Sequence, residues 1–136
     1  MIGAVIITHG TLWDGIMDAA SAIVGKIDNL DTVAVVGGDS TDDIRDRLSE
    51  AINSTNSGDG VIVFTDMFGG TPSNVALSFL GEAEVEVEML AGVNLPIVLK
   101  FLGRREEVKI PELIRFLMEY GKESIVPAGD MLKEEK

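Results

Sequence analysis

The sequence predicts an α/β protein: a doubly wound, mainly parallel open sheet with helices on both faces. Two observations predict this class. Short, nearly continuous apolar runs are typical of strands that are buried on both faces of a sheet. Between these runs, apolar residues recur at helical spacing, and a regular alternation of strands and helices favours parallel pairing. The chain has 136 residues, which is the length of one domain.

The first half of the chain contains three apolar runs, each followed by a helical segment. The expected strands span Ile2 to Thr8, Thr32 to Val36 and Gly60 to Thr65. The helical segments that follow them are Leu12 to Ile27, Thr41 to Ile52 and Thr71 to Leu80. The pair Thr71–Pro72 is typical of a helix N-cap followed by proline at the first helical position.

The second half is predicted to form a sheet edge and two further helices. Residues 84–89 alternate glutamate with an apolar side chain, as expected of a strand with one wet face near the edge of a sheet. Helices are expected from Leu95 to Leu102 and from Pro111 to Tyr120, the second stopped by Gly121, and a short final strand from Ser124 to Val126. The expected strand order is 2-1-3-4 plus that short strand. Residues 1–129 would form a single domain, and residues 130–136 a flexible tail.

Charge and composition exclude several classes of function. The chain has 11 basic and 23 acidic residues and a formal net charge of -12. Nucleic acids and anionic membrane surfaces require a basic face, so neither is an expected partner. The apolar runs are shorter than the roughly 20 residues that span a bilayer, and no signal peptide is evident, so we expect a cytoplasmic protein. With no cysteine and one histidine, thiol catalysis and Cys or multi-His metal sites are excluded, and no cofactor is expected.

The histidine and one aspartate each follow a predicted strand directly. His9 ends the first strand, and Asp66 ends the third. In the order 2-1-3-4 these strands are neighbours, and ligands bind such sheets outside the carboxyl ends of the strands. His9 and Asp66 should therefore be adjacent. A carboxylate that accepts a hydrogen bond from one ring nitrogen orients a histidine and raises the basicity of the other nitrogen, which can then act as a nucleophile.

The segment after Asp66 has the composition of a phosphoryl-binding loop. Two glycines allow the backbone to approach a ligand closely, and the free N–H groups of a helix start suit an anion. We expect a phosphoryl group on His9 to be held by residues at these two strand ends: Thr8, Gly10, Met67, Phe68, Gly69, Gly70 and Thr71.

Four further residues are weaker candidates for the same edge, and Phe68 has a second possible role there. Asp39 and Asp14 are interpreted first as turn or helix-start acids. Leu12, Trp13 and Phe68 could supply apolar area for a docking surface, although Leu12 fits the core equally well.

Three motifs carry a resemblance to a known family. They are T-H-G at 8–10, T-D-M-F-G-G-T-P-S-N at 65–74 and A-G-V-N-L-P at 91–96. With these motifs, the chain closely resembles the A domain, or EIIA component, of the mannose family (mannose/fructose/sorbose) of sugar phosphotransferase systems. The motifs are spread over most of the chain, and the length and order of elements also match.

The resemblance implies a phosphohistidine carrier. His9 would take a phosphoryl group from the histidine-containing phosphocarrier protein and pass it to a histidine of a separate EIIB component, while Asp66 orients the ring and Thr71 binds the phosphoryl group. It also implies a homodimer that exchanges a C-terminal strand, here Ser124 to Val126. The chain departs from some relatives, which have Trp in place of Phe68 or continue into a B domain.

Other functions stay open or are disfavoured by particular residues. An EIIA-like regulatory phosphoprotein without a role in transport is the main alternative, and an interaction domain with an inert His9 is a second. An aspartyl-phosphate receiver domain would need paired acids after the first strand and a late lysine. A histidine phosphatase would need an arginine before His9 and a second histidine, which the chain lacks. A flavodoxin-like nucleotide site would need a hydroxyl-rich loop after the first strand.

Overall fold

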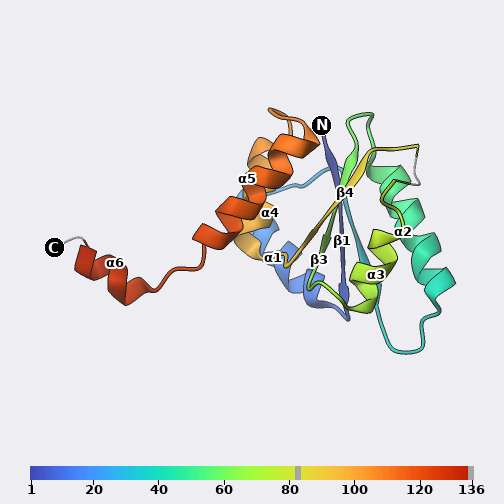
Figure 1. Cartoon of the computed structure of the whole chain (residues 1–136), viewed down its shortest axis with the longest axis horizontal. Helices are drawn as coiled ribbons and strands as arrows, with labels where there is room; N and C mark the ends of the chain where they lie inside the picture. Colours follow the sequence, from blue (N-terminus) through green and yellow to red (C-terminus); the bar gives the residue numbers. More distant parts are fainter. Residues whose placement is uncertain (82–83, 135–136) are drawn as a thin grey trace.

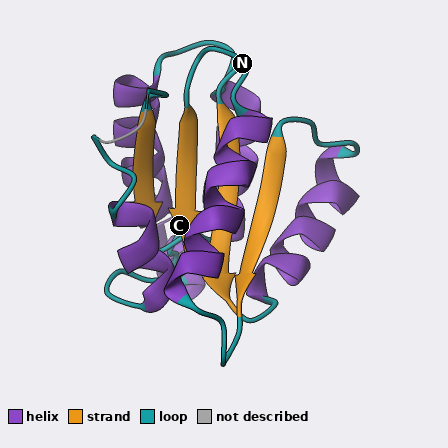
Figure 2. Cartoon of the chain, turned by 90° about the vertical axis from the view of Figure 1, so that its right-hand side faces the viewer, coloured by secondary structure: helices purple, strands orange, loops and turns teal. Residues whose placement is uncertain are grey.

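A four-stranded, all-parallel sheet forms the centre of the molecule. The computed structural model describes residues 1–81 and 84–134. Its strands are β1 (Gly3–His9), β2 (Leu30–Val35), β3 (Val61–Thr65) and β4 (Val87–Ala91), in the order β2-β1-β3-β4. This order confirms the prediction from sequence, including the edge position of the fourth strand. Figure 2 shows the four strands between two layers of helices.

The helices divide between the two faces of the sheet. One face is covered by α1 (Leu12–Val24), α4 (Leu95–Arg104) and α5 (Ile110–Glu123), and the other by α2 (Thr41–Thr55) and α3 (Thr71–Leu77) (Figure 1). Each crossover returns the chain to the amino end of the next strand. The carboxyl ends of all four strands therefore lie at one edge of the sheet.

The two central strands, β1 and β3, are largely apolar because helices cover both of their faces. In β1, Ala4 and Ile6 pack on the side of α4 and α5, whereas Val5 and Ile7 pack on the side of α2. All four side chains are fully buried. The same alternation places His9 on the α2–α3 side and the neighbouring Thr8 on the opposite side.

The outer edge of β2 is capped by side chains. The N–H of Thr32 donates to the Asp31 carboxylate (2.8 Å), and Arg47 donates to the carbonyl of Ala34 (2.8 Å). Asp39 accepts the N–H of Val36 (2.9 Å) and pairs with Arg47 (2.9 Å). These contacts occupy backbone groups that would otherwise be available to another strand. They also fix the β2–α2 loop at the carboxyl edge of the sheet.

The C-terminal region corrects the expected final strand. Residues 124–126 make no strand in the described chain: α5 continues to Glu123, Ser124 caps it, and Ile125 and Val126 are exposed. Gly121 does not stop the helix. A Cβ there would lie 2.6 Å from Ile97 Cδ1, so this glycine allows α4 and α5 to pack closely. Pairing of residues 124–126 with a second chain stays a prediction.

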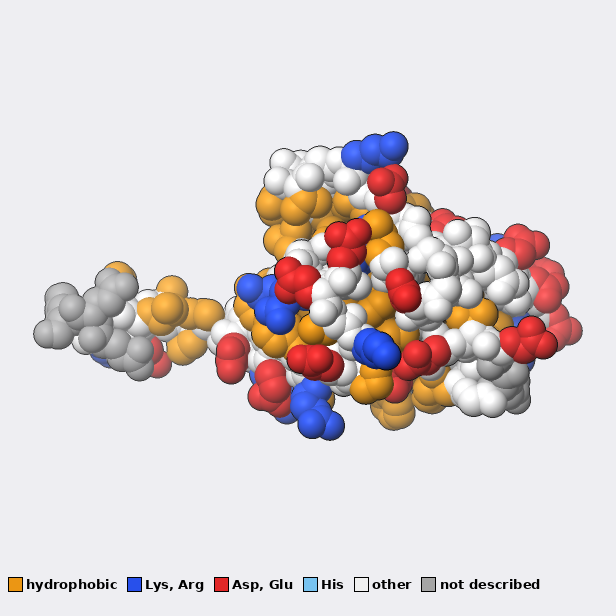
Figure 3. Space-filling view, turned by 90° about the horizontal axis from the view of Figure 1, so that it is seen from above, with side chains coloured by type: hydrophobic (Ala, Val, Ile, Leu, Met, Phe, Trp, Pro, Cys, Tyr) orange, Lys and Arg blue, Asp and Glu red, His pale blue; other side chains and the backbone are white. Residues whose placement is uncertain are grey.

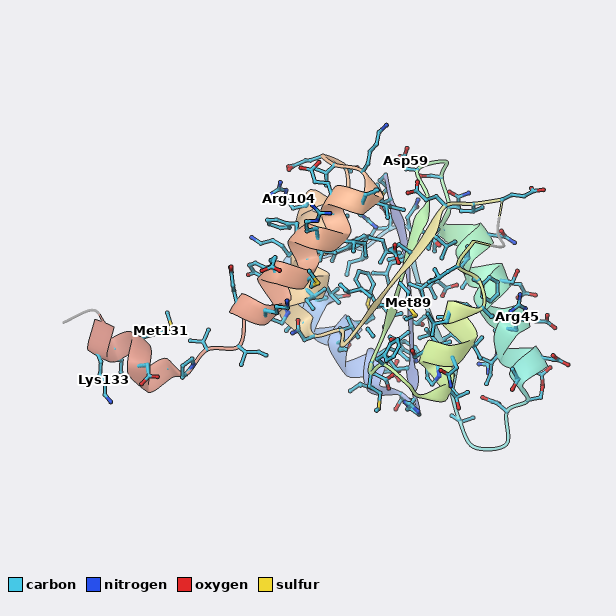
Figure 4. The ribbon with its side chains drawn as sticks, viewed as in Figure 1. Arg45, Asp59, Met89, Arg104, Met131 and Lys133 are labelled. Atoms are coloured by element: carbon cyan, nitrogen blue, oxygen red, sulfur yellow. The ribbon has the colours of Figure 1, made fainter. Side chains whose placement is uncertain are left out.

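The chain beyond α5 leads away from the domain. The helix α6 (Ala128–Glu134) occupies most of the predicted tail, and its residues Met131 and Lys133 lie far from the sheet (Figures 1 and 4). The flexibility of residues 130–136 stays a prediction. In the described part of the chain, no helix is long and apolar enough to cross a membrane.

Candidate active site

His9 and Asp66 meet at the carboxyl edge of the sheet. His9 is the last residue of β1, and Asp66 follows the last residue of β3; the pairing of Ile7 with Thr65 brings the two strand ends together. The ring Nδ1 of His9 lies 2.7 Å from Oδ2 of Asp66, and the His9 backbone N–H donates to the same oxygen at 2.9 Å. The adjacency inferred from the two strand ends is therefore present.

The Asp66 carboxylate is held in its charged form. Burial by itself raises the pKa of Asp66, but hydrogen bonds from the backbone and ring of His9 and from the Met67 N–H outweigh it and bring the pKa below its ordinary value. The Met67 N–H donates to Oδ1 at 2.9 Å, so both carboxylate oxygens are engaged. The Asp66 side chain is only 10% exposed, which limits screening by water.

One nitrogen of the His9 ring is left outside the contact with Asp66. Since Nδ1 faces an ionised carboxylate, we assign the proton to Nδ1 and the lone pair to Nε2. The His9 side chain is 50% exposed. A half-exposed imidazole with its remaining nitrogen unprotonated can act as a nucleophile toward a group carried by another protein.

The loop after Asp66 forms one wall of the site. Gly69 has φ +97°, a backbone conformation that favours glycine, and Gly70 is the N-cap of α3. Met67 and Phe68 are exposed, with Phe68 70% accessible. Thr71 begins α3 and is also exposed. The site therefore has an apolar rim, formed by Met67 and Phe68, beside the backbone N–H and carbonyl groups of Gly69 and Gly70.

Three of the predicted phosphoryl-binding residues have their donor groups engaged or turned away. The N–H of Gly10 donates to Val35 O (2.7 Å), and that of Met67 donates to Asp66. The Thr8 side chain is fully buried on the opposite face of β1 from His9, so only its backbone could contact a ligand on the ring. The loop residues Phe68–Gly70 and the Thr71 hydroxyl remain as candidate donors.

A structural support of the site was missed by the sequence analysis. The N–H groups of Gly92 and Val93 both donate to Thr65 O at 2.9 Å, so the loop after β4 fixes the residue that precedes Asp66. The Asn94 side chain then caps α4 by accepting the Ile97 N–H (2.9 Å). The available signal was Gly92 directly after a strand: its φ of +86° permits this turn.

The weaker candidates separate into structural and surface residues. Asp39 caps the β2–α2 loop, as its interpretation as a turn residue predicted. Asp14 is exposed in the first turn of α1. Trp13 packs against the core, whereas Leu12 and Phe68 are exposed. The opposite edge of the sheet, seen in Figure 3, carries acidic and basic side chains but no visible histidine.

Replacing Asp66 with Asn is expected to reduce the free energy of unfolding by about 1–2 kcal/mol at pH 7, because Asn cannot accept all three hydrogen bonds. Because the pKa of Asp66 is lower in the folded protein than its ordinary value of 3.8, the ionised carboxylate stabilises the fold at pH values above 3.8. This stabilisation is lost as the pH falls through the lower pKa of the folded state. The difference in free energy of unfolding between wild type and Asp66→Asn should therefore become smaller in acid. Urea unfolding from pH 7 to pH 2 measures it, with the exposed Asp18→Asn as control; a constant difference would contradict the prediction.

The fold and the site together define a class of protein. A parallel α/β domain that presents an exposed, carboxylate-held histidine at the carboxyl edge of its sheet has the features of a phosphotransfer protein. The family model EIIA-man, described as PTS system fructose IIA component, matches residues 3–118. The chain belongs to this mannose-type EIIA family of the sugar phosphotransferase system (PTS).

Individual relatives agree with this assignment. The chain is 30% identical over 136 residues to the PTS system fructose-specific EIIA component of Bacillus subtilis (strain 168), covering 100% of this chain and 92% of that protein. It is 26% identical over 125 residues to the mannose-specific EIIAB component of Escherichia coli (strain K12), covering 91% of this chain and 38% of that longer protein. The EIIA crystal structure from Streptococcus agalactiae matches with a TM-score of 0.88 at 26% identity, covering 96% of this chain and 99% of that one.

Proposed function

We propose that this chain carries a phosphoryl group on His9 Nε2, taking it from the histidine-containing phosphocarrier protein and passing it to a histidine of a separate EIIB component. The observation that carries the proposal is the Asp66 carboxylate on Nδ1 of a half-exposed His9. Family membership supports the role in a sugar phosphotransferase system.

The transfer can be written with this chain's own groups. The lone pair of His9 Nε2 forms the new N–P bond while the N–P bond of the donor breaks, and that electron pair returns to the donor's ring nitrogen. The proton stays on Nδ1, hydrogen-bonded to Asp66, which offsets the positive charge that develops on the ring. The residues Phe68–Gly70 and the Thr71 hydroxyl would stabilise the phosphoryl oxygens, the usual protein contribution to this reaction.

Docking of both partners would use the exposed rim around His9. Leu12, Val36, Met67 and Phe68 are large apolar side chains, all exposed and all on loops or helix starts at the carboxyl edge. An apolar patch of this kind suits a transient protein interface. The formal net charge of -12 would favour partners with a basic face and speed their encounter.

We also propose that the chain forms a homodimer through its C-terminal segment. Four exposed apolar side chains lie along this segment beyond α5: Ile125, Val126, Met131 and Leu132. The edge strand β4 is only half-buried along its length. A second copy could cover both surfaces, and sedimentation of the chain with and without residues 124–136 would test this.

Incubation with phosphoenolpyruvate, the first enzyme of the system and the phosphocarrier protein should add one phosphoryl group to the chain, as measured by intact mass. The bond should be labile in acid and stable in alkali. This lability is the behaviour of phosphohistidine, and because the chain has one histidine, absence of the added mass from His9→Ala would place the group on His9. No added mass, with a donor shown to be phosphorylated, would overturn the proposal. Subsequent loss of the group to EIIB tests the second step.

A further inference from the structure

We propose that Gly70 is a positioning residue for His9. Because Gly70 has no side chain, the imidazole lies directly against its backbone, and this contact keeps the ring in the orientation that presents Nε2. The inference rests on the proposed function, because it takes Nε2 as the reacting atom. It assigns a separate role to each of the two adjacent glycines, Gly69 and Gly70.

The His9 ring occupies the space that a side chain at position 70 would fill. A Cβ on Gly70 would lie 2.6 Å from Cε1 and 3.0 Å from Nε2 of His9. Carbon atoms that are not bonded do not approach this closely without displacement of one of them. The imidazole is thus confined between the Asp66 carboxylate at Nδ1 and the Gly70 backbone along its Cε1–Nε2 edge.

Backbone conformation does not explain the glycine at position 70. Gly70 has φ -86° and ψ 176°, values that other residues adopt readily. Gly69 is the opposite case, since its φ is +97° and an added Cβ would meet nothing within 4 Å. Gly69 therefore lets the loop turn, whereas Gly70 leaves room for the ring.

The wall formed by Gly70 is anchored on both sides. Its carbonyl accepts the N–H of Asn74 (2.9 Å) in the first turn of α3, and the other end of the loop is tied by the Met67 N–H to Asp66. A side chain at position 70 would therefore displace the ring more easily than the loop. Displacement would lengthen the Nδ1–Asp66 hydrogen bond and misdirect Nε2, and a shift of about 1 Å can cost roughly 100-fold in rate.

The test compares wild type with Gly70→Ala in two measurements. In the unphosphorylated protein, ¹⁵N NMR of the His9 ring should report a single Nδ1–H tautomer for wild type and the tautomer mixture of a free imidazole for the variant. Transfer from the phosphorylated carrier protein should fall at least about 10-fold. Wild-type ring shifts together with a wild-type transfer rate in Gly70→Ala would overturn the proposal.

Controls separate ring displacement from loss of fold and from failure of the proposed function. Gly37→Ala lies in the β2–α2 loop at the same edge, where an added Cβ meets nothing within 4 Å, and should change neither measurement. Gly70→Ser should reproduce the ring displacement, and thermal melting checks that each variant is folded. If wild type accepts no phosphoryl group while the Gly70→Ala ring shifts move, the proposed function fails and the positioning role stands.

Discussion

Replacing His9 with Ala is expected to abolish acceptance of the phosphoryl group, because the chain has no other histidine. His9 is half-exposed at the end of β1 and its side chain supports no core packing, so the variant should fold. Apart from the contribution of the lost hydrogen bond to Asp66, its free energy of unfolding should lie within about 0.5 kcal/mol of that of wild type. Intact mass after incubation with the phosphorylated carrier measures acceptance. An acid-labile group on His9→Ala would show that the assignment is wrong.

The matched control keeps the acceptor and removes its orienting charge. Asp66→Asn retains His9, so it should still accept one phosphoryl group, but about 100-fold more slowly. This effect lies between the loss caused by removing a hydrogen-bond partner of a metal-binding histidine and the loss caused by replacing the aspartate of a catalytic triad. The two variants together distinguish the nucleophile from the residue that orients it. Equal rates for wild type and Asp66→Asn would remove Asp66 from the mechanism.

The adjacency of His9 and Asp66 follows from two features that the sequence predicts: the positions of the buried strands and the 2-1-3-4 order of a doubly wound sheet. Strands buried on both faces have continuous apolar runs, so β1 and β3 were located from composition, and the first polar residues beyond them marked the carboxyl edge. Element ends were less accurate. The alternation predicts a strand over residues 84–89, whereas the strand that pairs with β3 is Val87–Ala91, which begins and ends later in the chain.

Features that depend on contacts between distant elements could not be predicted. Gly121 was interpreted as a helix stop, yet it serves the packing of α5 on Ile97, a residue of another helix. The choice of Nδ1 as the bonded ring nitrogen depends on the direction of the His9 side chain. The contact of Gly70 with that ring could not be predicted either, because a glycine that only allows a turn would have the same sequence context.

Gly3→Ala is expected to lower the free energy of unfolding by about 1–3 kcal/mol, or more if the backbone cannot adjust. An added Cβ would lie 2.1 Å from the carbonyl oxygen of Thr55 and 2.7 Å from its carbonyl carbon, both backbone atoms at the end of α2. Either β1 or α2 must shift, because neither atom belongs to a flexible side chain. Urea unfolding followed by circular dichroism measures the loss.

Gly15→Ala provides the matched control, because Gly15 lies in α1 and an added Cβ there meets nothing within 4 Å. This change should stabilise the protein by about 0.4–1 kcal/mol through the lower entropy of the unfolded chain. Equal stability of the two variants would contradict the assigned contact of β1 with α2. Gly3 lies at the opposite end of β1 from His9, so folded Gly3→Ala should transfer the phosphoryl group at the wild-type rate. A lower free energy of unfolding with an unchanged rate of phosphoryl transfer would show that the contact of α2 with β1 stabilises the fold but does not affect the chemistry at the carboxyl end of β1.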